Sequence, residues 1–181
     1  MSSPRIAPID PPYAAEVQAA FDTIMRGAPP LLLFRTVAQN PRVVQRMLAG
    51  GLLDRGSIPL RARELVILRT CARCGAAYEW GVHVATFAAK AGLDDRQLRS
   101  TVHGNADDDG WSVDDAVVLR LADQLHETND VDDALWAEAA ALYSPAQLVE
   151  LVMLAGLYHA VSYLANAMRI AREPFAPGFP E

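Results

Sequence analysis

Apolar residues recur every three or four positions along most of this chain, which is the spacing of a helix that buries one side. No segment alternates apolar and polar residues convincingly, as a half-buried strand does. Pro, Gly and helix-capping residues divide the pattern into about nine helical segments. Their expected ranges are 11–25, 31–39, 41–50, 59–74, 76–91, 94–102, a segment that begins after Ser112, 132–143 and 145–170. The pattern predicts an all-α fold with irregular ends at 1–10 and 173–181.

Length and composition favour a single domain. The chain has 181 residues, of which 51% are hydrophobic, so it can bury a sizeable core. It contains no internal repeat, no low-complexity tract and no linker long enough to divide it. We therefore predict one domain over residues 1–181.

Charge and apolar patterning restrict the class of partner. The net charge of −6 disfavours nucleic acid or an anionic membrane surface. Residues 151–168 are nearly all apolar, but His159, Ser162 and Asn166 lie among them, which favours a buried helix over a membrane span. With two cysteines and no secretion-type start, the chain is expected to be cytoplasmic and to act on a small molecule, without nucleic acid or membrane.

A carboxylate interrupts the apolar side of the segment 59–74. At about 100° per residue, Glu64 falls on the same side as Leu60, Ile67 and Leu68. An unpaired buried carboxylate is costly, so Glu64 needs a partner or must be neutral. It could have a functional role, or it could form a structural ion pair with an arginine of the same segment. These arginines are Arg61, Arg63, Arg69 and Arg73.

The next segment carries a second polar interruption. His83 shares its apolar side with Trp80 and Phe87, and Glu79 lies four residues before it. His83 could be a satisfied core residue, and Glu79 and His83 could be an ordinary helical pair. With Glu64 they offer two carboxylates and an imidazole on adjacent helices, a set suited to proton transfer. The trio could also bind a metal, but the chain has no HExxH or comparable pattern, so we predict no metal.

Cys71 and Cys74 form a CxxC pair, which usually indicates redox chemistry or zinc in a cytosolic protein. A four-cysteine zinc site would need another chain, because there is no second pair. The pair precedes Gly75 at the end of a helical segment, where the helix dipole disfavours a thiolate. We interpret both residues as small buried hydrophobes and expect free thiols.

The last segment turns polar toward its C-terminus. His159, Ser162 and Asn166 continue a side that begins with apolar residues. This side could line a pocket or satisfy a contact between helices, and both interpretations stay open. The remaining histidines, His103 and His126, carry no signal in the sequence.

The stretches RARELVILRT at 61–70 and GAAYEWGVH at 75–83, with residues 28–41 upstream, carry a resemblance to a known family. They resemble the carboxymuconolactone decarboxylase and alkylhydroperoxidase D family, with a core motif at 60–92. The resemblance implies an alkylhydroperoxidase D-like helical bundle as one domain. It also implies association into dimers, trimers or hexamers, with active sites near the subunit interfaces.

The resemblance points to the branch of this family that lacks catalytic thiols. In the peroxidase branch a Glu is followed by a CxxC, and a His comes four residues after the second Cys. Glu64 and His83 match the Glu and the His, but Ala76 and Glu79 occupy the two cysteine positions. The CxxC of this chain lies too early to replace them, and peroxide reduction needs both a nucleophilic and a resolving thiol.

The resemblance and the polar residues together predict a carboxymuconolactone decarboxylase-like lyase that acts by acid–base chemistry on a small carboxylated lactone or related intermediate. In this scheme His83 is the acid, Glu64 is its partner or proton shuttle, and Glu79 tunes His83. An unidentified Arg would hold the substrate carboxylate, and no cofactor is required. Three further residues are assigned to the substrate pocket: Tyr78, Trp80 and His159.

Two other functions stay open. One is an alkylhydroperoxidase-type thiol peroxidase, with peroxiredoxin activity, that uses Cys71 and Cys74 in a displaced arrangement. The other is a non-catalytic oligomeric member that keeps the fold and lacks the chemistry. Under each of them a homo-oligomer is expected, because several segments carry apolar residues on more than one side.

Overall fold

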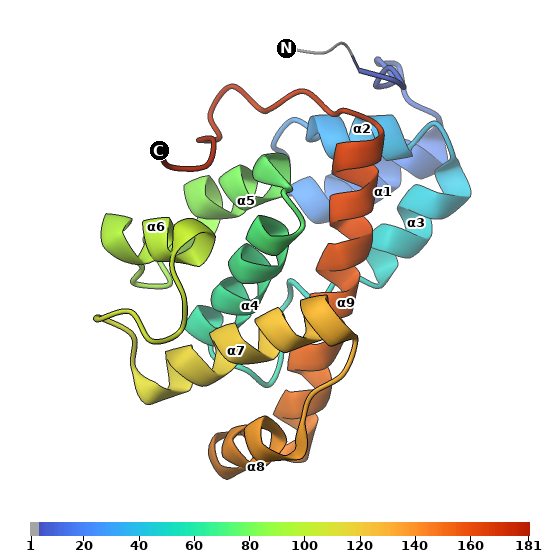
Figure 1. The fold of residues 1–181 in the computed structure, drawn as a ribbon. Helices are drawn as coiled ribbons and strands as arrows, with labels where there is room; N and C mark the ends of the chain where they lie inside the picture. The colour runs from blue at the N-terminus through green and yellow to red at the C-terminus, as the bar shows by residue number, and fades with distance from the viewer. Residues whose placement is uncertain (1–3) are drawn as a thin grey trace.

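The structure is a computed structural model that describes residues 4–181, and within that range it contains only helices and irregular segments (Figure 1). The prediction of an all-α fold is confirmed. Nine α-helices and one π-helix make up the regular structure: α1 (Ala15–Met25), α2 (Leu32–Val37), α3 (Pro41–Ala49), α4 (Leu60–Arg73), α5 (Ala77–His83), η1 (Val84–Ala88), α6 (Asp95–His103), α7 (Val113–Thr128), α8 (Asp133–Leu142) and α9 (Pro145–Ala167).

Capping residues set most of the helix starts. The side chains of Asn40, Asp94, Ser112, Asp132 and Ser144 each accept a hydrogen bond from the backbone N–H three residues further on. Such a cap satisfies an N–H that the helix itself leaves without a partner and is worth about 1 kcal/mol. These starts agree with the sequence pattern because a cap is a local interaction.

Both terminal helices are shorter than predicted. The first begins at Ala15 rather than Pro11, because a second proline follows Pro11 and keeps that residue out of the helical region. Tyr13 instead packs edge-on against Phe21, with ring centroids 5.1 Å apart. The last helix ends at Ala167 rather than near residue 170.

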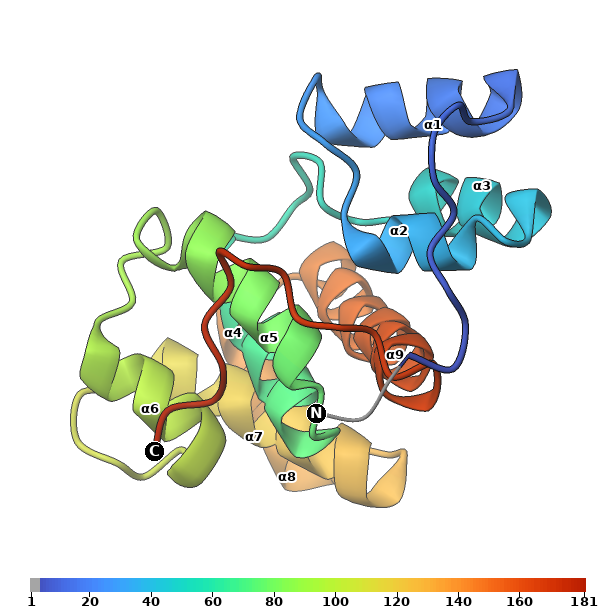
Figure 2. The same ribbon diagram turned by 90° about the horizontal axis from the view of Figure 1, so that it is seen from above.

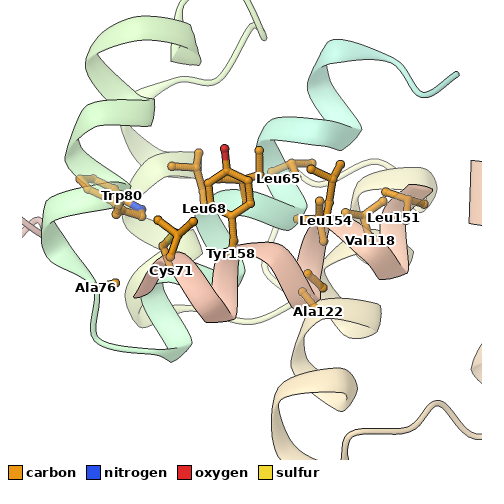
Figure 3. Close-up of a cluster of buried hydrophobic side chains, with 14 of the residues drawn as sticks. Leu65, Leu68, Cys71, Ala76, Trp80, Val118, Ala122, Leu151, Leu154 and Tyr158 are labelled. Atoms are coloured by element: carbon orange, nitrogen blue, oxygen red, sulfur yellow. The ribbon is translucent and has the colours of Figure 1, made fainter. Parts of the chain in front are cut away.

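Helix α4 lies at the centre of the molecule, between α5, α7 and α9 (Figure 1). Its side chains are buried from Ala62 to Cys71 without interruption. Figure 3 shows the core that results, to which α4 contributes Leu65 and Leu68, α9 contributes Leu154 and α7 contributes Val118. A helix buried on all sides must satisfy its polar side chains inside the protein.

Arginines of α4 connect it to its neighbours. Arg69 is fully buried and donates to both carboxylate oxygens of Asp123 on α7, at 2.6 and 2.8 Å. It also donates to the backbone carbonyls of Ser100, Thr101 and Gly104 at the end of α6. These bonds hold α6 and α7 against α4.

Helix α9 is long and apolar enough to cross a membrane by length and composition alone. Its buried side nevertheless packs against α4 and supplies Leu151, Leu154 and Tyr158 to the core. The prediction of a buried helix therefore agrees with its position in the fold.

The C-terminal segment crosses the outer side of α5 (Figure 2). Tyr78 Oη donates to Glu173 Oε1 at 2.8 Å, and the rings of Trp80 and Phe179 meet edge-on at 5.6 Å. Between these contacts Gly81 approaches Pro177 so closely that a Cβ atom would collide with its carbonyl oxygen. The absence of a side chain at Gly81 is what lets the segment lie flat on α5.

The outer side of α9 remains apolar and exposed. Val149, Met153 and Tyr163 are 70%, 56% and 66% exposed, and they follow one another at helical spacing with Gly156 and Ala160 between them. Small residues between large apolar ones let another helix approach closely. We propose that a second copy of this chain covers this face.

Substituting Gly81 tests the packing of the C-terminal segment. Gly81→Ala is expected to displace the segment and to lower the melting temperature by several degrees, since the collision is with backbone. Gly178→Ala is the control, because the added atom there meets only the flexible end of Arg172. Thermal unfolding followed by circular dichroism measures both. Equal melting temperatures for the two variants would contradict this account.

Adding charged residues to the exposed apolar face of α9 tests whether the chain forms a homo-oligomer through this face. Light scattering is expected to give a mass that is a multiple of 19.6 kDa for the wild-type protein. The double substitution Val149→Lys and Met153→Lys should shift it toward 19.6 kDa, because it buries charges in the proposed interface. Val113→Lys, at a 73% exposed residue on α7, is the matched control. A wild-type monomer at micromolar concentration would show that no second copy covers this face.

Candidate functional site

Glu64 and His83 meet inside the protein. Glu64 projects from the middle of α4 and is 0% exposed, while His83, the last residue of α5, is 2% exposed. His83 Nδ1 lies 2.7 Å from Glu64 Oε2, so the imidazole N–H donates to the carboxylate. Arg63 Nε donates to the other carboxylate oxygen at 2.8 Å. Both partners that the sequence left open for Glu64, an arginine and the histidine, are therefore present.

Tyr158 completes a chain of hydrogen bonds that the sequence analysis missed. Its hydroxyl lies 2.9 Å from His83 Nε2, on the opposite side of the imidazole from Glu64. Tyr158 projects from α9 and is buried with Leu154 and Val161. The Glu64–His83–Tyr158 chain thus joins three helices, α4, α5 and α9.

Glu79 lies at the edge of this chain. Its Oε1 atom is 3.4 Å from His83 Nε2, one helical turn along α5. Its Oε2 atom is buried without a hydrogen-bond partner among the described residues, as are Ser162 Oγ and Thr70 Oγ1. Buried polar atoms without partners are uncommon in stable cores and often mark functional sites.

The two carboxylates determine the charge of His83. Burial alone lowers the pKa of His83, but hydrogen bonds and charges from Glu64 and Glu79 outweigh burial and raise it to about 9. Burial, with the charge of Glu79 as the next contribution, raises the pKa of Tyr158 far above its usual value, so the phenol stays protonated. At neutral pH the site therefore holds an imidazolium between a carboxylate and a neutral phenol.

The helix that carries His83 widens immediately after it. The sequence predicts one continuous segment over 76–91, but the structure has α5 and then the π-helix η1. Phe87 of η1 packs on the His83 ring at 5.3 Å and lies under the Arg63 guanidinium at 5.0 Å. π-Helical turns occur mostly as short insertions in α-helices and frequently at functional sites. Here the turn positions an aromatic wall beside the acid–base pair.

The two thiols are free and differ in environment. Cys71 is fully buried, and burial followed by the charge of Glu79 raises its pKa well above the usual value. Cys74 is half-buried at the end of α4, and burial raises its pKa as well. The interpretation as a buried hydrophobe fits Cys71. It does not fit Cys74, whose Sγ lies 3.8 Å from His126 Nδ1.

The residues assigned to a substrate pocket are engaged elsewhere. Tyr78 Oη bonds Leu33 N and Glu173, and Trp80 Nε1 donates to Thr101 Oγ1 at 3.0 Å. His159 Nε2 lies 3.1 Å from His126 Nδ1. These contacts give Tyr78 and Trp80 structural roles and place His159 in a second cluster, so none of the three has a described contact with the Glu64–His83 pair.

A surface hollow of about 260 Å³ lies next to the site. It is lined by Arg63 and by residues of the connection between α3 and α4, with Glu150 of α9 on its rim. Glu150 fixes this connection by accepting hydrogen bonds from the backbone and side chain of Ser57. Arg63 is the residue that both lines the hollow and hydrogen-bonds to the buried Glu64.

The other arginines of α4 are ion-paired away from the hollow. Arg61 pairs with Asp115, while Arg69 and Arg73 both pair with Asp123. Among these four, Arg63 alone is both within hydrogen-bonding distance of Glu64 and on the wall of the hollow.

Solved structures resemble this fold over its whole length. A cysteine-to-alanine variant of the debrominase Bmp8, in complex with 2,3,4-tribromopyrrole, matches with a TM-score of 0.72 at 16% identity, covering 97% of this chain and 94% of that one. The same debrominase in its apo form gives 0.70 at 15% identity, covering 94% and 92%.

A protein of unknown function from Agrobacterium tumefaciens, proposed to be the antioxidant defence protein AhpD, gives a TM-score of 0.59 at 15% identity, covering 71% of this chain and 84% of that one. These similarities establish the fold. A comparison with curated proteins gave no match.

A family model supplies the remaining comparison. Residues 39–124 match the model of the carboxymuconolactone decarboxylase family. This range begins just before α3, ends within α7 and contains Glu64, Glu79 and His83. Residues 39–124 are accordingly similar to the carboxymuconolactone decarboxylase family, and the chain has an all-helical fold shared with these solved structures.

Proposed function

We propose that this chain is an acid–base enzyme of the carboxymuconolactone decarboxylase type, a lyase that acts on a small carboxylated lactone or a related intermediate. The observation that carries the proposal is the buried Glu64–His83–Tyr158 chain, with bond lengths of 2.7 and 2.9 Å. This chain has a proton donor, Tyr158, at one end and a carboxylate, Glu64, at the other. Such an arrangement suits a reaction in which a carbanion forms and is then protonated.

The proposed proton path runs along this chain. The His83 imidazolium donates through Nδ1 to Glu64 and presents its Nε2–H to Tyr158 Oη. When Tyr158 gives its hydroxyl proton to a substrate carbon, His83 Nε2 can replace that proton in the same step. The phenolate is never left unpaired in the core, where its charge would be costly.

In the proposed reaction the bond between the substrate carbon and its carboxylate breaks, and carbon dioxide leaves. The electron pair of that bond passes into the conjugated lactone carbonyl as an enolate. The proton from Tyr158 or His83 then forms the new C–H bond, and solvent returns a proton to the site. No oxidant, reductant or metal enters this balance.

Arg63 is the proposed holder of the substrate carboxylate. Its guanidinium faces the hollow and also bonds Glu64, so an incoming anion can share it without a large movement. His83 and Tyr158 are only 2% and 3% exposed, so a substrate can reach Tyr158 only if the side chains or segments that cover it move.

The thiol peroxidase is the weaker candidate. Its nucleophile must be a thiolate, whereas burial raises the pKa values of both Cys71 and Cys74. Neither thiol has a hydrogen bond to His83 among the described residues, and Glu79 occupies the position of a family cysteine. The non-catalytic alternative is disfavoured by Glu79, whose Oε2 atom is buried beside His83 without a hydrogen-bond partner among the described residues.

We keep the cytoplasm as the proposed location and a small molecule as the proposed partner. The net charge of −6 argues against nucleic acid and anionic membranes. Among residues 4–181, α9 is the one helix long and apolar enough to cross a membrane, and one side of it belongs to the core.

Turnover of carboxylated lactones tests the proposal. Release of carbon dioxide from a panel of such lactones should fall by about a hundredfold in His83→Gln, the usual range for loss of a general acid. Cys71→Ala is the matched control on α4, since it removes the CxxC pair and leaves the proton path intact. Reduction of hydroperoxide by the wild-type protein with a dithiol, abolished by Cys71→Ala, would establish the peroxidase instead.

The charge of His83 also predicts a pH dependence of stability. Because its folded pKa of about 9 exceeds the ordinary 6.5, its protonation stabilises the fold fully below about pH 6.5, and this contribution is lost as the pH rises toward 9. The advantage of wild type over Glu64→Gln in unfolding free energy should shrink across this window by up to about 3 kcal/mol.

Urea unfolding between pH 6 and pH 9.5 measures this difference. Asp115→Asn is the control, because hydrogen bonds from Arg61 and Ser112 outweigh burial and lower the pKa of Asp115, which confines its effect to acid pH. Parallel curves for wild type and Glu64→Gln across the window would mean that Glu64 does not hold the proton on His83.

A further inference from the structure

We propose that Cys74, His126 and His159 form a binding site for a divalent transition metal ion, with zinc as the ion that fits best. Cys74 follows the last residue of α4, His126 lies in the last turn of α7, and His159 lies in the middle of α9. Within residues 4–181 these three form the one group of His, Cys, Asp or Glu side chains whose ligand atoms are close enough to share an ion.

The separations of the ligand atoms match those around a tetrahedral ion. Cys74 Sγ lies 3.8 Å from His126 Nδ1, which lies 3.1 Å from His159 Nε2, and all three atoms are within 4.8 Å of one another. Zinc bonds of about 2.3 Å to sulfur and about 2.05 Å to nitrogen, at tetrahedral angles, give ~3.6 Å between S and N and ~3.3 Å between the nitrogens. The Cys74–His126 and His126–His159 separations are thus within about 0.2 Å of the values for zinc, and seating the ion would mainly require Cys74 Sγ and His159 Nε2 to lie closer together than their present limit of 4.8 Å.

The surroundings hold the ligands and leave one direction open. Asn166 Nδ2 donates to the backbone carbonyl of Cys74 at 2.9 Å and fixes the end of α4 against α9. The ring of Tyr163 meets that of His159 edge-on at 6.0 Å. All three ligand residues are half-buried, so water can reach the fourth position of a tetrahedral ion.

The donor set selects among metals. One thiolate and two imidazoles suit zinc, whereas calcium and magnesium require oxygen ligands that this cluster does not contain. On binding, the Cys74 S–H bond breaks, its proton goes to solvent, and the sulfur electron pair forms the bond to the ion. No electron transfer is involved.

This site is separate from the proposed acid–base chain. Tyr158 faces His83 in the core, while the next residue, His159, faces His126. Cys71 likewise lies in the core, one turn before Cys74. The metal proposal does not depend on the proposed function, because it uses none of the same side chains.

Cobalt is the probe for this site. We expect the reduced, metal-free protein to bind one Co²⁺ per chain, with the visible bands of a tetrahedral ion and a thiolate-to-cobalt charge-transfer band. Zn²⁺ should then abolish these bands by displacing cobalt. Zn²⁺ should also slow alkylation of Cys74 by iodoacetamide.

Matched variants identify the ligands. Cys74→Ala should remove the charge-transfer band, and His126→Ala should weaken cobalt binding by about a hundredfold or more, above the range for outer-shell changes. Cys71→Ala and His103→Asn, which lie outside the cluster, should bind as wild type does, with circular dichroism as the check on folding. The proposal is overturned if wild type shows no thiolate-to-cobalt band, or if Cys74→Ala keeps it. In either case the His126–His159 contact is only a hydrogen bond between the two rings.

Discussion

The burial of α4 on all sides is the constraint on which this structure depends. A central helix with charged side chains is stable only if each charge finds partners in the interior, because an unpaired buried ion costs several kcal/mol. Arg69 meets this requirement with Asp123 and three backbone carbonyls, which fixes α6 and α7. Glu64 meets it with Arg63 and His83. The same requirement therefore produces a structural anchor near one end of α4 and the buried Arg63–Glu64–His83 hydrogen bonds near the other.

The sequence predicted the fold class and most helix starts, because caps and apolar spacing are local properties. It also singled out Glu64 and His83, since each interrupts an apolar side. Tyr158 was missed because the side of α9 that the apolar spacing predicted to be buried differs by one residue from the side that is buried. His159 was therefore assigned to the substrate pocket and Tyr158 was not. The π-helix after His83 and the sharing of Asp123 by two arginines depend on tertiary packing, which spacing along the chain does not encode.

The position of the thiols changes the chemistry available to the fold. Where the family's peroxidase branch has cysteines, this chain has Ala76 and Glu79. Glu79 adds negative charge beside both His83 and Cys71, which favours the imidazolium and disfavours a thiolate. Cys74, beyond the reach of this effect, lies instead among imidazoles.

Tyr158 and His159 are consecutive residues of α9, yet they contact different partners. Tyr158 contacts His83 on one side of the helix, and His159 contacts His126 on the other. A one-residue insertion or deletion in the preceding turns of α9 would rotate both side chains by about 100° and remove them from their partners together. A change in the length of this helix would therefore disrupt the surroundings of His83 and of His126 at once, whereas a substitution at Tyr158 or His159 would remove only one of these contacts.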